Sequence, residues 1–230
     1  MADTHVQEVK NDDVVLKAKS VFTQYQKPIL TVLIALIVLI GGWFGYQNFV
    51  VAPKQEAAEN AMWKAEQYFR EDSLKLALDG DKFNRGFTYI INNYGSTKAG
   101  NLAKYYAGVC YLRLGNFNKA VDNLKDFSTS AKQIQMMAYG ALGDAYSELN
   151  KNDEAVDYYK KASNEFTDDA TMSSEYLFRA ALKLEVLGKN NEALELYKEL
   201  KEKYPTTERG FSADKYIYRL SVIPNDFSTK

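Results

Sequence analysis

The chain has few of the residues that most often carry catalysis or covalent cross-links. Its 230 residues include one cysteine, Cys110, and one histidine, His5. A single cysteine cannot form an intramolecular disulfide, and one histidine in an N-terminal tail provides neither a metal-binding pair nor a catalytic partner for Cys110. The sequence also has no glycine-rich phosphate loop. We therefore expect a protein that is not an enzyme and uses no cofactor or metal.

Helix breakers and excess charge are also scarce. Four prolines and 13 glycines argue against a disordered or low-complexity chain. The formal net charge is −1, from 29 basic and 30 acidic side chains. Nucleic-acid binding needs a basic surface, so the composition indicates no such partner.

One long segment lacks charge altogether, from Ile29 to Val51. As a helix it would be roughly 34 Å long, enough to cross a hydrocarbon core of about 30 Å. Aromatic residues such as Trp43 and Tyr46 crowd its C-terminal part, as expected at a membrane interface. A buried core helix is the alternative, but cores seldom use so long an uncharged run. The sequence predicts a transmembrane helix at 29–51.

The residues before the span indicate an uncleaved anchor and its orientation. A polar tail, residues 1–28, precedes the apolar run, and no small-residue cleavage site follows it. Positive charge is retained in the cytoplasm. The sequence therefore predicts a cytoplasmic N-terminus and an extracytoplasmic domain from residue 52, because more lysines precede the span (Lys10, Lys17, Lys19 and Lys27) than follow it closely (Lys54 and Lys64).

The tail itself contains a short apolar stripe at helical spacing. It comprises Val14, Ala18, Val21, Phe22 and Tyr25. One interpretation is an interfacial helix on the inner leaflet, and the other is a cytoplasmic docking helix.

The extracytoplasmic part repeats itself. Three alanines mark the repeat: Ala120, Ala155 and Ala193. A small residue precedes each alanine at the same distance along the chain, and a polar turn lies between the small residue and the alanine. A repeat of roughly 35–40 residues is typical of helical-hairpin arrays. The small residues, Gly108, Gly143 and Ala181, would allow two antiparallel helices to cross closely.

This pattern resembles the tetratricopeptide repeat over residues 99–205. Glu154-Ala155 and Glu192-Ala193 match the family closely, and Pro205 stands where the family usually ends a repeat. The first repeat departs from the pattern, with Lys104 in place of an early aromatic residue. The resemblance implies an all-α fold, in which a single transmembrane helix precedes a solenoid of helical hairpins.

The ends of the array can also be predicted. The segment from Tyr94 to Gly100 is echoed by the segment from Tyr204 to Gly210, which predicts a further helix after each. We expect a long leading helix from about Lys54 to Leu78, a second helix from Phe83, and a closing helix at 207–222 that Pro224 stops. The predicted organisation is a tail (1–28), a transmembrane helix (29–51), a leading hairpin (52–98), repeats with a closing helix (99–222) and a final tail (223–230).

By the family's geometry, the first helix of each hairpin lines a concave groove. The candidate peptide-groove residues are Leu102, Tyr105, Val109, Leu112, Met137, Phe178 and Leu182, with Gly140, Asp144 and Glu175 beside them. Tyr105 and Val109 replace the Lys and Asn with which family members hold a peptide carboxylate. A mostly apolar groove suits an extended or helical polypeptide instead. The alternative is that some of these residues pack against the leading hairpin or the closing helix.

The overall architecture resembles the YfgM-type family of bacterial membrane proteins. That resemblance implies an inner-membrane protein with a periplasmic repeat domain, which accompanies the SecYEG translocon and a PpiD-like chaperone and meets polypeptide clients. Gly41 and Gly45 form a Gly-x-x-x-Gly pair, a candidate contact for another membrane helix. The alternative function is a structural subunit of another envelope assembly or secretion complex.

Overall fold

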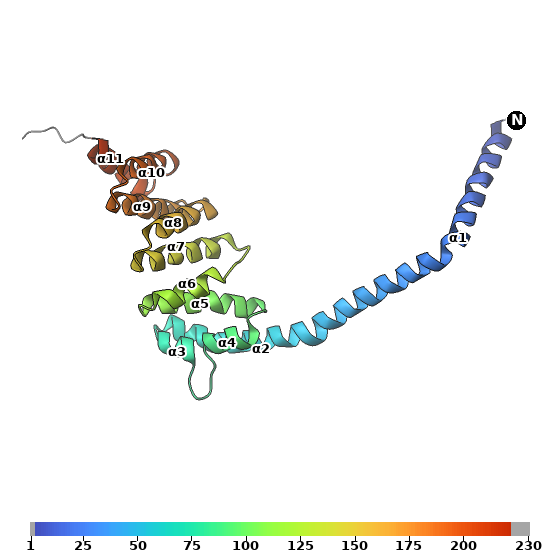
Figure 1. Cartoon of the computed structure of the whole chain (residues 1–230), viewed down its shortest axis with the longest axis horizontal. Coiled ribbons are helices and arrows are strands. Elements are labelled where there is room, and N and C mark those ends of the chain that lie inside the picture. Colours follow the sequence, from blue (N-terminus) through green and yellow to red (C-terminus); the bar gives the residue numbers. More distant parts are fainter. Residues whose placement is uncertain (1–2, 222–230) are drawn as a thin grey trace, which may run out of the picture. The chain divides into compact units, whose positions relative to one another are not determined.

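The computed structural model describes residues 3–221, and before Tyr25 it describes few side chains. The described residues form helices and no β-strand, so the predicted all-α class is confirmed (Figure 1). They divide into two compact units, Met1–Lys54 and Gln55–Lys230. The predicted tail at 223–230 and its Pro224 lie outside the described residues.

The first unit is a continuous helical segment. Helix α1 spans Asp3–Tyr46, a π-helical turn η1 spans Gln47–Val51, and α2 begins at Ala52. By length and composition, Tyr25–Arg70 is the one described helix able to cross a membrane, and none of its most apolar window is buried. A core helix would bury that window against the protein, so the exposed apolar surface favours the membrane span. Most side chains of the 14–25 stripe are not described, and its role stays a prediction.

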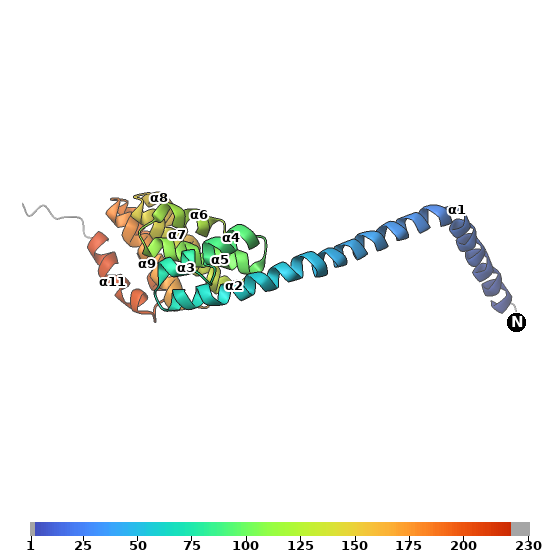
Figure 2. The same ribbon diagram turned by 90° about the horizontal axis from the view of Figure 1, so that it is seen from below.

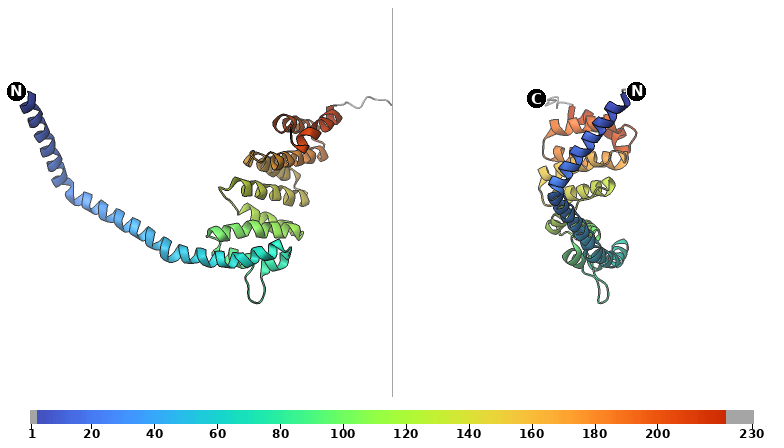
Figure 3. Two further views of the ribbon diagram at one scale, coloured as in Figure 1. Left: turned by 180° about the vertical axis from the view of Figure 1, so that it is seen from behind. Right: turned by 90° about the vertical axis from the view of Figure 1, so that its right-hand side faces the viewer.

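The second unit is a stack of antiparallel hairpins, which follow one another in chain order in Figures 1 and 3. Its repeat helices form three hairpins over the region where the sequence predicts them: α5 (Lys98–Arg113) with α6 (Phe117–Lys125), α7 (Lys132–Glu148) with α8 (Asn152–Glu165), and α9 (Ala170–Val186) with α10 (Asn190–Lys203). The closing helix α11 spans Glu208–Ser221 and packs against α9 and α10, beside which it lies in Figure 2.

Small residues are required where the two helices of a hairpin cross. A Cβ on Gly108 would lie 2.5 Å from Leu124 Cγ, and one on Gly143 would lie 2.5 Å from Tyr159 Cδ1. Both distances are far inside van der Waals contact, so a larger residue would push the helices apart. The small-residue positions found in the sequence therefore have the predicted packing role.

The leading hairpin differs from the prediction. One helix from Lys54 to Leu78 was expected, but α2 ends at Arg70 and α3 covers Leu74–Asp79. Asp72 lies between them with a φ of 58°, a conformation that aspartate tolerates better than most residues. Arg113 Nη2 donates a hydrogen bond of 2.6 Å to Asp72 Oδ1, which ties this break to α5. The prediction of a single long helix was wrong because a tertiary contact favours the break.

The next helix, α4, covers Phe87–Tyr94 rather than beginning at Phe83, because the chain first forms a loop. The Asp81 carboxylate accepts hydrogen bonds from the backbone N–H groups of Phe83 and Asn84, at 2.7 and 2.6 Å, and from the Tyr68 hydroxyl. The Tyr68 hydroxyl and these amides hold the pKa of Asp81 well below its usual range. Phe83 is 92% exposed, and Figure 1 shows the loop projecting from the hairpins.

Two hydrophobic cores stabilise the second unit. One joins the leading hairpin to α5 and includes Phe87, Ile90 and Cys110. The other runs from α6 to α11, and Leu102 packs against both. Cys110 is fully buried and burial raises the pKa of its thiol to about 12, so it is an inert core residue.

Candidate functional site

The first helices of the second and third hairpins carry a chain of charged side chains. Arg179 on α9 donates hydrogen bonds to Asp144 on α7 at 2.9 Å and to Glu175 at 2.8 Å. Tyr159 on α8 donates its hydroxyl to Asp144 at 2.7 Å, and Arg209 on α11 donates to Glu175 at 2.7 Å. We call these five residues the Asp144–Arg209 network. It joins four helices: α7 and α8 of the second hairpin, α9 of the third hairpin, and the closing helix α11.

The charges of this network stabilise one another. Partial burial opposes the charge of Arg179, but the hydrogen bond that it donates to Glu175 and the charge of Asp144 raise its pKa above the usual value. Burial acts similarly on Glu175, yet Arg179 and Arg209 lower its pKa overall. Burial and the bond to Asp144 raise the pKa of Tyr159. The network is therefore a partly exposed strip in which acidic and basic side chains alternate.

A second ion pair connects α9 to the closing helix. Arg219 Nη2 donates to Glu185 Oε2 at 2.7 Å, and the same carboxylate accepts a bond of 3.1 Å from Tyr197. The buried Tyr197 ring is stacked on Tyr216 of α11, with 4.9 Å between the ring centroids. These contacts hold α11 against the last hairpin, formed by α9 and α10, at the C-terminal end of the solenoid.

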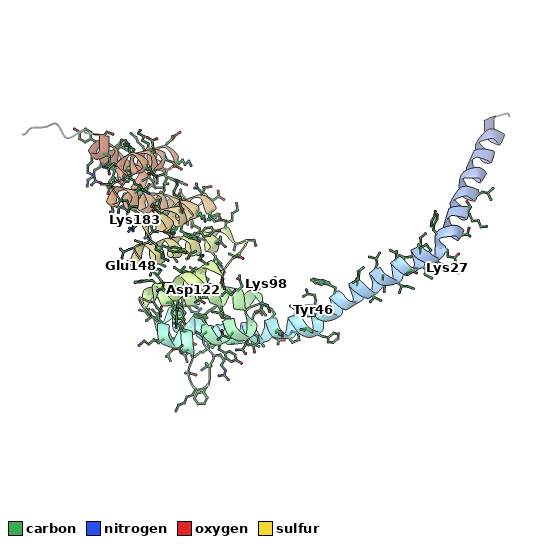
Figure 4. All side chains as sticks on the ribbon, viewed as in Figure 1. Lys27, Tyr46, Lys98, Asp122, Glu148 and Lys183 are labelled. Carbon is green, nitrogen blue, oxygen red and sulfur yellow. The ribbon has the colours of Figure 1, made fainter. Side chains whose placement is uncertain are left out.

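Two depressions flank the Asp144–Arg209 network, and Tyr159 lines both. The larger, about 400 Å³, is bounded by α5 and α7 and includes Leu112, Asp144 and Glu148. The smaller, about 150 Å³, is bounded by α9 and includes Arg179, Leu182, Lys183 and Val186. Figure 4 labels Glu148 at the end of α7 and Lys183 on α9. Apolar side chains thus lie on either side of a charged strip.

A third depression, of about 350 Å³, lies between α2 and α5. Trp63 and Leu102 supply its apolar surface, and Glu59 and Lys98 lie at its edge. Gln55 Oε1 accepts a hydrogen bond of 2.8 Å from the Lys98 backbone N–H and fixes the two helices here. The indole of Trp63 is largely exposed, an unusual position for so large an apolar group.

Three of the seven predicted groove residues line these depressions. Leu102, Leu112 and Leu182 each line one of the three, and Met137 is exposed on α7. Val109 is half-buried. Tyr105 is half-buried too: its ring lies 5.5 Å from that of Phe127, and burial raises its pKa to about 12. Tyr105 is therefore partly a core residue.

Phe178 is not a groove residue. It is only 6% exposed, because α11 covers it. Its ring lies 6.0 Å from Tyr197 and 5.1 Å from Tyr216, and the Arg209 guanidinium lies 4.3 Å above it. The prediction that this side chain faces an open groove was wrong, and the alternative of packing against the closing helix is correct for it.

Gly140 is also covered. A Cβ there would lie 2.2 Å from the ring of Tyr176, which occupies that part of the face.

Four residues of these depressions and of the Asp144–Arg209 network were not predicted from the sequence: Arg179, Arg209, Val186 and Trp63. The spacing of Glu175 and Arg179 on one predicted helix was a usable signal, since side chains four apart are neighbours. Arg209 gave no such signal, because its partner Glu175 lies far away in the sequence.

The glycine pair of the first unit stays a candidate. A Cβ built on Gly41 or on Gly45 would meet no atom within 4 Å, so both positions of α1 are open to a neighbouring helix.

Comparisons with known proteins identify the repeat. Two family models described as tetratricopeptide repeats match the chain, one over residues 138–168 and the other over residues 102–130 and 175–207. The search of curated proteins found no match. Two crystal structures from Podosopora anserina are similar to this chain. Both are of a protein labelled a kinesin light chain with nearly identical TPR-like repeats, and one of them is of a substituted variant.

Both structures are 13% identical to this chain, with TM-scores of 0.54 and 0.53, and cover 72% of it. The matches span 85% and 86% of the other chains. At this identity the likeness concerns the fold alone. The repeat domain is a tetratricopeptide-type helical solenoid, and such repeats imply a protein–protein interaction scaffold.

Proposed function

We propose that this chain, with its three tetratricopeptide repeat matches, is a membrane-anchored adaptor that binds polypeptide segments on the face around Asp144 and Arg179. The observation that carries the proposal is the pair of depressions beside the charged strip, one lined by Leu112 and the other by Leu182 and Val186. Apolar side chains of a bound segment would enter the depressions, and its backbone amides and carbonyls would hydrogen-bond to the charged side chains between them.

The expected affinity is modest. Burying an apolar side chain contributes about 1.5–3 kcal/mol, and two or three such groups fit the depressions. The cost of ordering a flexible segment cancels much of this gain. Modest affinity suits short-lived contact with many sequences. We propose no catalytic role, because Asp144 and Glu175 are already paired with arginines.

The double substitution Leu182→Ser and Val186→Ser tests this face. It removes the apolar surface of the smaller depression, so we expect several-fold less chemical cross-linking of the full-length protein to an unfolded reporter polypeptide. Because both side chains are exposed, the helical content and the melting temperature should stay nearly unchanged.

A matched control is available in α3 and just after α5. Leu76 and Leu114 line another depression and are each 41% exposed, as is Leu182. The double variant Leu76→Ser and Leu114→Ser should cross-link like the unmodified protein. Equal loss in both double variants would mean that binding depends on exposed apolar surface anywhere and not on this face.

For the cellular setting, we propose the inner membrane of a bacterium, with the repeat domain in the periplasm beside the SecYEG translocon and a PpiD-like chaperone. The support is the architecture: one apolar N-terminal helix, more lysines in the flank before it than in the comparable flank just after it, and a following repeat domain. Polypeptides leaving the translocon are unfolded, which matches the modest, sequence-tolerant binding proposed for the groove. A structural subunit of another envelope assembly is the second candidate, favoured if the protein copurifies in fixed stoichiometry with such an assembly.

The membrane helix offers a test of partner contact. Replacing Gly41 and Gly45 by leucine would fill the open positions on α1 and prevent close approach of another helix. We expect the double variant to insert normally but to recover several-fold less translocon in mild-detergent purification. Leucine at Trp43, which helical spacing puts on the opposite side of α1, is the control. Unchanged recovery with both glycines replaced would show that the pair is no contact site.

A further inference from the structure

Each depression beside the charged strip contains one charged side chain that has no ion-pair partner among the described residues. In the larger depression, Arg113 is paired with Asp72 at 2.6 Å, and Asp144 is paired with Arg179 at 2.9 Å. The remaining charged residue of its lining is Glu148, which is exposed. The larger depression therefore has a free negative charge.

The smaller depression has a free charge of the opposite sign. Its charged residues are Arg179 and Lys183. Arg179 is paired with Asp144 at 2.9 Å and with Glu175 at 2.8 Å. Lys183 is half-buried and forms no ion pair with any part of the chain that the structure describes. The smaller depression therefore has a free positive charge.

The two free charges stand at matching levels of their helices. Because successive helices of the stack are antiparallel, α7 and α9 run in the same direction. Glu148 follows Asp144 by one helical turn on α7, and Lys183 follows Arg179 by one helical turn on α9. The Asp144–Arg179 ion pair joins the two helices. One turn further on, an acid and a base face the depressions and are free to bind other groups.

We propose that a segment bound on this face carries a basic side chain that pairs with Glu148 and an acidic side chain that pairs with Lys183. Apolar neighbours of these two residues enter the depressions. The inference rests on the proposed function, because it specifies the class of polypeptide that the same face binds. Since packed helices lie about 10 Å apart and an extended chain rises about 3.3 Å per residue, the two charges of the segment are about three positions apart.

The opposite charges also determine the direction of the bound segment. A segment whose basic residue comes first lies with its N-terminal part over α7, and one whose acidic residue comes first lies the other way round. A segment with two basic or two acidic residues makes one attractive and one repulsive contact in either direction. Because exposed ion pairs are weak, each contact is expected to change the affinity about two- to fivefold.

Four synthetic peptides test this inference by photo-cross-linking to the full-length protein in mild detergent. The peptides share one sequence of leucine, serine and glycine with a terminal benzoylphenylalanine. They differ at two positions three residues apart, which hold a lysine and a glutamate, two lysines, two glutamates or two glutamines. At low salt, the mixed-charge peptide should cross-link several-fold more than either peptide with two like charges. High salt should remove most of this difference, because it screens exposed charges.

Charge reversal in the protein provides the matched variants. Glu148→Lys gives both depressions a positive charge and should shift the preference to the peptide with two glutamates. Lys183→Glu should shift it to the peptide with two lysines. The double variant should again prefer the mixed-charge peptide. Glu202→Lys, at an exposed position of α10 outside both depressions, should leave the preference of the unmodified protein unchanged.

The outcomes separate this inference from the proposed function. Equal cross-linking of the four peptides, or a preference that the single reversals do not change, would overturn the inference and leave polypeptide binding on this face intact. Absence of cross-linking to all four peptides, with an unchanged helical circular dichroism signal, would overturn both. If Lys183→Glu impairs folding, Glu148→Lys decides alone, because that side chain is exposed.

Discussion

Replacement of Phe178 by alanine is expected to lower the free energy of unfolding by about 3–5 kcal/mol, the usual cost of removing a buried phenylalanine. Its ring lies among Tyr197, Tyr216 and the Arg209 guanidinium, so the substitution leaves a cavity between the last hairpin and α11. Urea denaturation of the detergent-solubilised full-length protein, followed by the helical circular dichroism signal, measures the change.

Leu182 is the matched control. It lies one turn further along α9 and is 41% exposed, so alanine there should cost less than about 1 kcal/mol. If Phe178→Ala instead leaves unfolding unchanged and lowers polypeptide capture, Phe178 is a binding residue and α11 does not pack as described.

The hairpins could be predicted from the sequence because their determinants are local and recur. Gly108, Gly143 and Ala181 mark the helix crossings, and the turns between the helices are short and polar. The closing helix was predicted from the match between Tyr204–Gly210 and Tyr94–Gly100. Both segments now prove to have the same threonine–glycine hydrogen bond at the start of the next helix.

The errors concern features that depend on residues distant in sequence. The break after Arg70 contains neither glycine nor proline, and its Asp72 is held by Arg113. The burial of Phe178 follows from the position of α11, which periodicity within α9 does not reveal. The charged strip likewise joins Asp144 to Arg179 and Glu175 to Arg209, and only the Glu175–Arg179 spacing could be read from one helix.

The side of the membrane on which the repeat domain lies tests the account most directly, and the expected effect is all or none. Trypsin added to intact spheroplasts should digest the repeat domain and spare the N-terminal tail before the span. The first cuts are expected after Lys82 and Arg85, which flank the exposed Phe83 in the loop between α3 and α4.

A variant with Lys82→Gln and Arg85→Gln should lose these first fragments while its domain stays accessible, which verifies where cleavage begins. Detergent lysis provides the second control, since the domain must be digested once the membrane is dissolved. A periplasmic adaptor predicts complete loss of the repeat domain from intact spheroplasts with the tail protected. A repeat domain that survives in intact spheroplasts and is digested only after lysis would place it in the cytoplasm and contradict the proposed role beside emerging polypeptides.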